Sequence, residues 1–292
     1  MLRPFRSVLY IPASKERALE KAREIAADAI IFDLEDAVAP EEKAQARLTL
    51  ARFLSEVDYA PRYRIVRING FDTVWGREDA LAFGRHAGAD AVLVPKVGGP
   101  ADLDAVAGIV GGKPLWAMME TAAGMLNAAA IAGHGRLEGM VMGTNDLAKE
   151  LGARGRADRL PLMAGLGLCL LAAKASGRVI VDGVYNAFRD DDGLRAECAQ
   201  GRDMGFDSKT LIHPLQVEMC NAVFAPSAEE VDLAKRQIAA FNAAQAQGQG
   251  VAVLDGRIVE NLHVVSAQAV LAKADAIAAR RDWAQRIAPA AE

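Results

Sequence analysis

The sequence has few cysteines, few aromatic residues and no excess of basic charge, and each shortage excludes a class of protein. Only three cysteines occur and none forms a CxxC pair, so neither a disulfide framework nor a zinc knuckle is expected. The 34 basic residues are outnumbered by 38 acidic ones, which gives no reason to expect a nucleic-acid partner. Residues 1–6 lack the apolar core of a signal peptide, and the longest apolar stretch, 160–173, is too short to cross a bilayer. We therefore expect a cytoplasmic protein with no membrane partner.

Glycine-rich phosphate-binding motifs are also missing, because no GxGxxG or GxxxxGK sequence follows any apolar run. What the chain has instead is a repeated alternation of short apolar runs with longer alanine-rich helical stretches. Continuous apolar runs of this length are typical of parallel strands buried on both faces. The eight runs cover residues 8–11, 29–32, 64–68, 91–94, 115–119, 140–142, 179–181 and 210–212. Their number favours a closed α/β barrel, the (β/α)8 TIM barrel, over an open doubly wound sheet.

The pattern changes near residue 225. A proline and a serine are followed by a helical stretch over residues 229–246, a short apolar run at 251–254 and a final helix over about 263–281. This remainder is too small and too helical for a second fold. We therefore predict a catalytic barrel domain over residues 1–225 and a helical C-terminal extension over 226–292 that acts as a lid.

Acidic residues follow two successive predicted strands, at the rim where barrel enzymes place their active sites. Glu120 follows the fifth strand and Asp146 the sixth. Neighbouring strands lie about 4.8 Å apart, so the two carboxylates could hold one ion, and oxygen ligands suit Mg²⁺. The alternative is that each acid caps the helix that follows it.

Two basic residues also lie at the predicted rim. Arg67 lies on an apolar strand, where a guanidinium needs a partner to offset the cost of burial. It could capture a substrate carboxylate bidentately, or it could pair internally with Asp33, Glu35 or Asp36. Lys96 could attract an anionic substrate or pair with the same acids.

Seven short motifs along the chain, taken together, resemble the citrate lyase β-subunit-like and malyl-CoA lyase family of the HpcH/HpaI aldolase superfamily. They occur in the family's order through nearly the whole chain, which is far more specific than any one of them. The motifs are RSVLYIP (6–12), DLEDAV (33–38), RIN (67–69), VPK (94–96), META (119–122), GTNDL (143–147) and KTLIHP (209–214).

The resemblance implies a (β/α)8 barrel with Mg²⁺ bound by Glu120 and Asp146 and a substrate carboxylate bound by Arg67. It also implies that Asn145 and Lys96 contribute with Glu120 to substrate binding. The acids Glu35 and Asp36 join Arg67 in the catalytic group, because they can orient its guanidinium or hold metal-bound water.

The activity that the resemblance implies is an Mg²⁺-dependent carbon–carbon lyase. The substrate would be a 3-hydroxy carboxylic acyl-CoA such as malyl-CoA or citramalyl-CoA, and the products acetyl-CoA and a 2-oxo acid. Three alternatives stay open: a malyl-CoA thioesterase or malate synthase activity, a citrate lyase β subunit that acts on an acyl-carrier thioester with partner subunits, and an aldolase of free oxo acids.

The C-terminal segment carries one departure from the family pattern. Members with a CoA-lyase lid often have Asp after a Gly-x-(Met/Leu)-(Ile/Val) stretch, whereas this chain has Glu260 after Gly256-Arg257-Ile258-Val259. Glu260 could serve as the catalytic acid/base, or it could be a surface residue at a helix start. The family also implies a homotrimer or hexamer in which the C-terminal segment of one subunit covers a neighbour's site.

Overall fold

The computed structural model describes residues 3–287, and the chain divides into two compact units. The larger unit is Phe5–Phe224, and the smaller begins at Ala225 and includes the N-terminal segment before Phe5.

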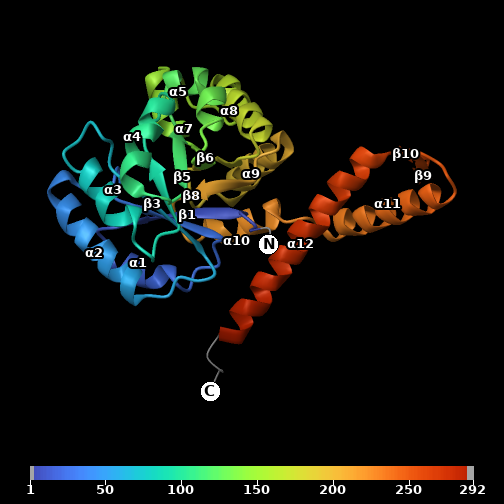
Figure 1. Cartoon of the computed structure of the whole chain (residues 1–292), viewed down its shortest axis with the longest axis horizontal. Helices are drawn as coiled ribbons and strands as arrows, with labels where there is room; N and C mark the ends of the chain where they lie inside the picture. Colours follow the sequence, from blue (N-terminus) through green and yellow to red (C-terminus); the bar gives the residue numbers. More distant parts are fainter. Residues whose placement is uncertain (1–2, 288–292) are drawn as a thin grey trace. The chain divides into compact units, whose positions relative to one another are not determined.

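The larger unit is a closed barrel of eight parallel strands, each hydrogen-bonded to the next, with the eighth paired to the first (Figure 1). The strands are β1 (Ser7–Pro12), β2 (Ala29–Asp33), β3 (Tyr63–Arg67), β4 (Ala91–Val94), β5 (Leu115–Met119), β6 (Leu137–Met142), β7 (Val179–Asp182) and β8 (Ser208–Leu211). Every predicted apolar run overlaps one of these strands, so the prediction of a (β/α)8 barrel is confirmed.

Helices follow the strands and surround the barrel (Figure 1). They are α1 (Glu16–Ala22), α2 (Lys43–Glu56), α3 (Gly76–Gly84), α4 (Pro100–Val110), α5 (Ala122–Leu126), α6 (Ala128–Ala132), α7 (Thr144–Glu150), α8 (Met163–Ala175), α9 (Asp191–Met204) and α10 (Gln216–Phe224), with short 3-10 turns at Pro40–Glu42 and Leu160–Leu162. Alternate strand residues pack inside the barrel and against the helices, giving two separate apolar clusters. Burial on both faces explains why the strands are continuous apolar runs.

The eighth strand begins two residues before the apolar run that predicts it, because it contains a buried lysine. Lys209 is fully buried, and its Nζ lies 3.1 Å from Asp182 and 2.6 Å from Glu197. Arg159 also contacts Asp182, at 2.8 Å. Paired charges of this kind are tolerated in a core, but they hide a strand from a search for apolar runs.

The smaller unit consists of two long helices joined by a β-hairpin. Helix α11 (Ala228–Ala246) begins with a capping box in which Ser227 and Glu230 exchange hydrogen bonds. Strands β9 (Ala252–Leu254) and β10 (Arg257–Val259) pair antiparallel, and α12 (Asn261–Ile287) then packs back along α11 (Figure 1). Residues 261–280 of α12 are long and apolar enough to cross a membrane by length and composition alone, with a mean hydropathy of 1.2.

Candidate active site

Glu120 is buried at the carboxyl end of β5, and its two oxygens have different surroundings. Oε1 accepts a hydrogen bond from the Lys96 backbone N–H at 2.8 Å, and Lys96 adopts a left-handed backbone (φ 52°) that is unusual for a residue other than glycine. Oε2 is buried and has no hydrogen-bond partner among the described residues. Burial, reinforced by the charge of Glu35, raises the pKa of Glu120 to about 7. A buried, unpartnered carboxylate oxygen is costly unless a further group binds it.

Glu120 and Asp146 line the same cavity of about 290 Å³ at the strand ends. Asp33 and Asp36 also line it, whereas Arg67 is the one cationic side chain among its lining residues. This excess of carboxylates attracts a cation and repels an anionic substrate unless a cation is bound. Among the described residues no group of three or more His, Cys, Asp or Glu could hold a metal. The unpartnered Oε2 of Glu120 and the excess of carboxylates fit an ion that takes two protein carboxylates and completes its shell with water or substrate, as Mg²⁺ does.

Arg67 is buried at the end of β3, and the internal ion pairs that the sequence left as an alternative are present. Its Nε and Nη2 donate to the two carboxylate oxygens of Asp33 at 2.7 and 2.6 Å. Its Nη1 donates to Asp36 at 3.2 Å and lies 2.9 Å from Glu35. These three acids bring both sides of the guanidinium into ion pairs, so bidentate capture of a substrate carboxylate requires one of them to move.

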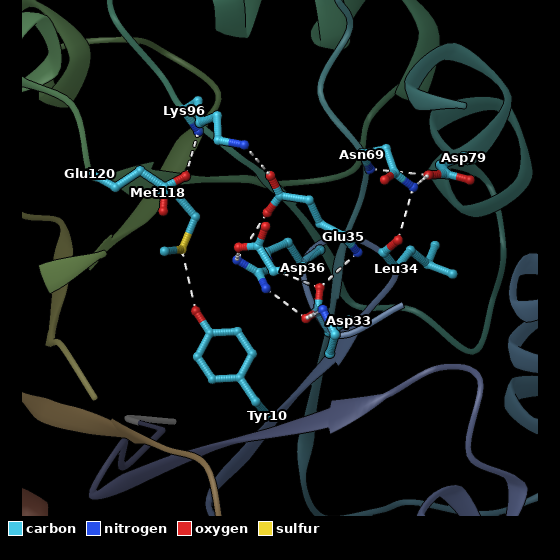
Figure 2. Close-up of polar contacts among 12 residues, drawn as sticks. Tyr10, Asp33, Leu34, Glu35, Asp36, Asn69, Asp79, Lys96, Met118 and Glu120 are labelled. Atoms are coloured by element: carbon cyan, nitrogen blue, oxygen red, sulfur yellow. Dashed lines mark hydrogen bonds and ion pairs between the residues drawn. The ribbon is translucent and has the colours of Figure 1, made fainter. Parts of the chain in front are cut away.

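Glu35 and Lys96 form an ion pair beside this cavity rather than within its lining. The Lys96 Nζ lies 3.0 Å from Glu35 Oε1. Figure 2 draws this ion pair as a dashed line. Both residues line a neighbouring cavity of about 300 Å³, and Asp36 lines both cavities. Burial raises the pKa of the Glu35 carboxyl, while Arg67 and Lys96 oppose that shift. Lys96 thus contributes twice, through its backbone to Glu120 and through its side chain to Glu35.

Asn145 is exposed at the start of α7 and lines the cavity. Its side chain and that of Asn186 exchange two hydrogen bonds, at 2.8 and 3.3 Å. Asn69, the third residue of the RIN motif, lies away from this cavity. Its side-chain amide donates to Asp79 at 2.6 Å and to the Leu34 carbonyl at 3.0 Å (Figure 2). Asn69 therefore braces the loop after β3 and does not line the cavity.

Glu260 belongs to the smaller unit, at the turn between β10 and α12. The residue is exposed, and its backbone N–H donates to His263 Nδ1 at 3.0 Å. The segment before it forms a strand of a hairpin, which the sequence does not predict. The structure thus brings seven predicted site residues to two adjoining cavities in the barrel and leaves Glu260 in the other unit. The seven are Glu35, Asp36, Arg67, Lys96, Glu120, Asn145 and Asp146.

Among the cavity-lining residues that the sequence-based site lacks, a tyrosine and a methionine carry groups that can contact a ligand. Tyr10 on β1 and Met118 on β5 both line the cavity, and the Tyr10 hydroxyl lies 3.4 Å from the Met118 Sδ (Figure 2). Both lie inside apolar runs, where tyrosine and methionine are normally read as core residues. The period-two alternation of a strand places them on the barrel interior, which is the signal that could have identified them.

Comparison with known proteins identifies a family, curated relatives and a related solved structure. The family model described as HpcH/HpaI aldolase/citrate lyase matches residues 6–214. A (3S)-malyl-CoA thioesterase of Cereibacter sphaeroides strain KD131 is 70% identical, over 95% of this chain and 97% of the relative. An L-malyl-CoA/beta-methylmalyl-CoA lyase of Cereibacter sphaeroides strain ATCC 17025 is 34% identical, over 95% and 96%. The structure of CitE from Mycobacterium tuberculosis with magnesium, acetoacetate and coenzyme A has a TM-score of 0.79 and 31% identity, over 92% of this chain and 97% of that one.

These relatives correct the prediction of a carbon–carbon lyase as the leading activity. Four relatives at 67–70% identity are named as thioesterases, which are hydrolases, whereas the lyases are only 34% identical. The prediction was wrong because the motifs indicate the family, and relatives of this chain are named for either reaction, so the motifs alone do not separate the two. The alternative prediction, a malyl-CoA thioesterase, fits the relatives better.

The family itself is supported by independent observations. The eight-stranded barrel, the order of the rim motifs and the family match over residues 6–214 agree with one another. The related structure that contains magnesium, acetoacetate and coenzyme A covers 92% of this chain. The chain therefore belongs to the HpcH/HpaI aldolase/citrate lyase family of enzymes.

Proposed function

We propose that the protein hydrolyses the thioester of (3S)-malyl-CoA to malate and free coenzyme A. The observation that carries the proposal is the 70% identity, over 95% of the chain, to a relative with that name. The cavity supports it, because 290 Å³ is room for a small acyl group and a cation but not for a whole coenzyme A. The nucleotide end of the substrate would then lie outside this cavity.

In this proposal Glu120 and Asp146 hold Mg²⁺. The fit rests on the unpartnered Oε2 of Glu120 and on the excess of carboxylates in the cavity. When bound, the ion supplies Lewis-acid polarisation of a substrate oxygen and neutralises charge beside the acid. Lys96 keeps the Glu120 carboxylate oriented through its backbone N–H. Asp33 keeps the Arg67 guanidinium in place at the wall of the cavity.

Hydrolysis also needs a base. Water adds its oxygen to the thioester carbonyl carbon, the carbon–sulfur bond breaks, and one proton passes from the water to the sulfur of coenzyme A. We assign the base to Glu260 or to the Glu35–Asp36 pair, which differ in position. Glu260→Gln and Glu35→Gln separate the two assignments: the variant that removes the base lowers kcat by about 10²-fold or more with little change in KM.

The test of the function measures the products. Purified protein with (3S)-malyl-CoA and Mg²⁺ is expected to release free thiol and malate in equal amounts, with EDTA abolishing the release. Free thiol is followed with a thiol reagent, and the acids are separated by chromatography. Acetyl-CoA and glyoxylate in place of free thiol would contradict the proposal, as would no turnover.

We further propose that the protein is a homotrimer or hexamer in which the smaller unit covers the site of a neighbouring copy. The unit exposes a set of large apolar side chains, which a soluble monomer rarely does to this extent. They include Val253, Ile258, Leu262 and Val265, each more than half exposed. Light scattering is expected to give a trimer or larger, and a monomer would contradict the proposal.

A cytoplasmic location is also proposed. All three cysteines are free and buried, as is usual in a reducing compartment. Cell fractionation tests it, and recovery in the membrane pellet through the apolar part of α12 would contradict it.

A further inference from the structure

The guanidinium of Arg67 is already paired with acidic side chains, so its N–H groups are not free to bind the carboxylate of a substrate. Asp33 takes the Nε and Nη2 side bidentately, and Nη1 faces Asp36 and Glu35. Asp33 is itself held by the backbone N–H groups of Glu35 and Ala37, at 2.9 and 3.1 Å, so it does not move aside freely. A carboxylate that enters the cavity needs a donor other than the fork of Arg67.

Tyr10 supplies a donor at this position. Its ring lies under the guanidinium of Arg67, 5.1 Å from the ring centroid to Cζ, and its hydroxyl reaches the cavity beside Met118. The sulfur of Met118 is the hydroxyl's hydrogen-bond partner among the described residues, at 3.4 Å (Figure 2). A thioether is a weak acceptor, so the phenol keeps most of its donor strength for another group.

The phenol remains a donor at neutral pH. Burial raises the pKa of Tyr10 well above its usual value, although the charge of Arg67 opposes the shift. A neutral hydroxyl is useful in this cavity for a second reason: it can bind an anion without adding a positive charge that would repel the bound cation.

We propose that the Tyr10 hydroxyl binds the carboxylate of the substrate's hydroxy-acid end and so selects acyl groups that carry this acid. The choice of a hydroxy acid rests on the proposed function, whereas the donor role rests on the geometry alone. Arg67 then contributes mainly its positive charge above the Tyr10 ring, and its guanidinium stays hydrogen-bonded to Asp33.

The test measures binding without turnover. Malate is titrated calorimetrically into the Mg²⁺-loaded full-length protein and into Tyr10→Phe, which keeps the ring under Arg67 and removes the hydroxyl. A hydrogen bond to a charged group predicts a roughly 10- to 100-fold weaker affinity for malate in Tyr10→Phe. Affinity for free coenzyme A, which has no such acid, is expected to stay unchanged.

Tyr63→Phe is the matched control. Tyr63 begins β3 inside the same barrel, and its hydroxyl donates to Glu138 outside the lining of this cavity. The control is expected to bind malate as the wild type does.

Three results would overturn the proposal: Tyr10→Phe binds malate as tightly as the wild type, it loses affinity for coenzyme A to the same extent, or the wild type itself does not bind malate at millimolar concentration. If the Tyr10→Phe effect is seen but malyl-CoA is not hydrolysed, the proposed reaction fails while the role of Tyr10 stands.

Discussion

Gly143, between β6 and α7, has no room for a methyl group, so Gly143→Ala perturbs the candidate metal site without changing any ligand. A Cβ at this position would lie 2.4 Å from Glu120 Cβ and 2.5 Å from Glu120 Oε2. The backbone conformation of Gly143 (φ −97°) is open to alanine, so the effect is a steric one.

The size of the effect follows from the contact distance. Carbon atoms in contact lie about 3.5–4.0 Å apart, so the Glu120 side chain must shift by roughly 1 Å or the chain before α7 must move. Overpacking of this kind costs about 1–3 kcal/mol of stability. A displacement of about 1 Å at a site that positions reacting groups lowers activity about 10²-fold. Gly143→Ala is therefore expected to weaken the affinity for Mg²⁺ strongly, while the melting temperature falls only by the amount that a loss of about 1–3 kcal/mol of stability produces.

Calorimetric titration of Mg²⁺ into the metal-free protein, with a thermal melt of each variant, measures both quantities. The control is Gly167→Ala in α8, where a new Cβ meets no atom within 4 Å. Alanine in a helix interior should be neutral or stabilising there, by roughly 0.5–1 kcal/mol. Wild-type Mg²⁺ affinity in Gly143→Ala would refute the reasoning, since it would mean that Glu120 does not lie against Gly143 when it binds the ion.

Three further predictions concern buried charges. Arg67→Lys keeps the charge but loses the fork that binds Asp33, and kcat/KM for malyl-CoA is expected to fall by at least about tenfold; wild-type kinetics would show that the fork is dispensable. Lys209→Met leaves the buried Asp182 with one cation fewer, and urea unfolding is expected to show a loss of about 3–5 kcal/mol; an unchanged midpoint would contradict this. Because the folded-state pKa of Glu120 is raised from 4.5 to about 7, the folded metal-free protein binds the extra proton, so its stability is expected to fall as pH rises from about 4.5 to 7. Melts in EDTA measure that fall, which Glu120→Gln should abolish; a melting temperature that rises over this range would contradict it.

Much of the barrel could be predicted because each of its strands is buried on both faces. That burial makes strands such as Ile30–Phe32 and Val92–Val94 continuous apolar runs, which recur between helical stretches along the barrel part of the chain. The start of β8 could not be predicted, because Lys209 is stabilised by acids 27 and 12 residues away. The β9–β10 hairpin was missed because β10 has exposed residues on a three-residue strand.

The choice between hydrolysis and carbon–carbon cleavage did not follow from the motifs. Relatives of this chain are named as thioesterases and as lyases, so motifs that indicate the family do not separate the two reactions. Similarity over the whole chain supplied the correction that the short motifs could not.

The sequence by itself determined the barrel and the rim on which Glu120, Asp146 and Arg67 meet, because parallel strands bring their carboxyl ends to one face. Only the tertiary structure decided what those groups are free to do. Arg67 is bound by acids 31 and 34 residues away, and one oxygen of Glu120 is held by a backbone 24 residues away, which leaves the other oxygen without a partner. Contacts between distant strands set which donors and acceptors remain unpaired, and no local pattern of residues encodes them.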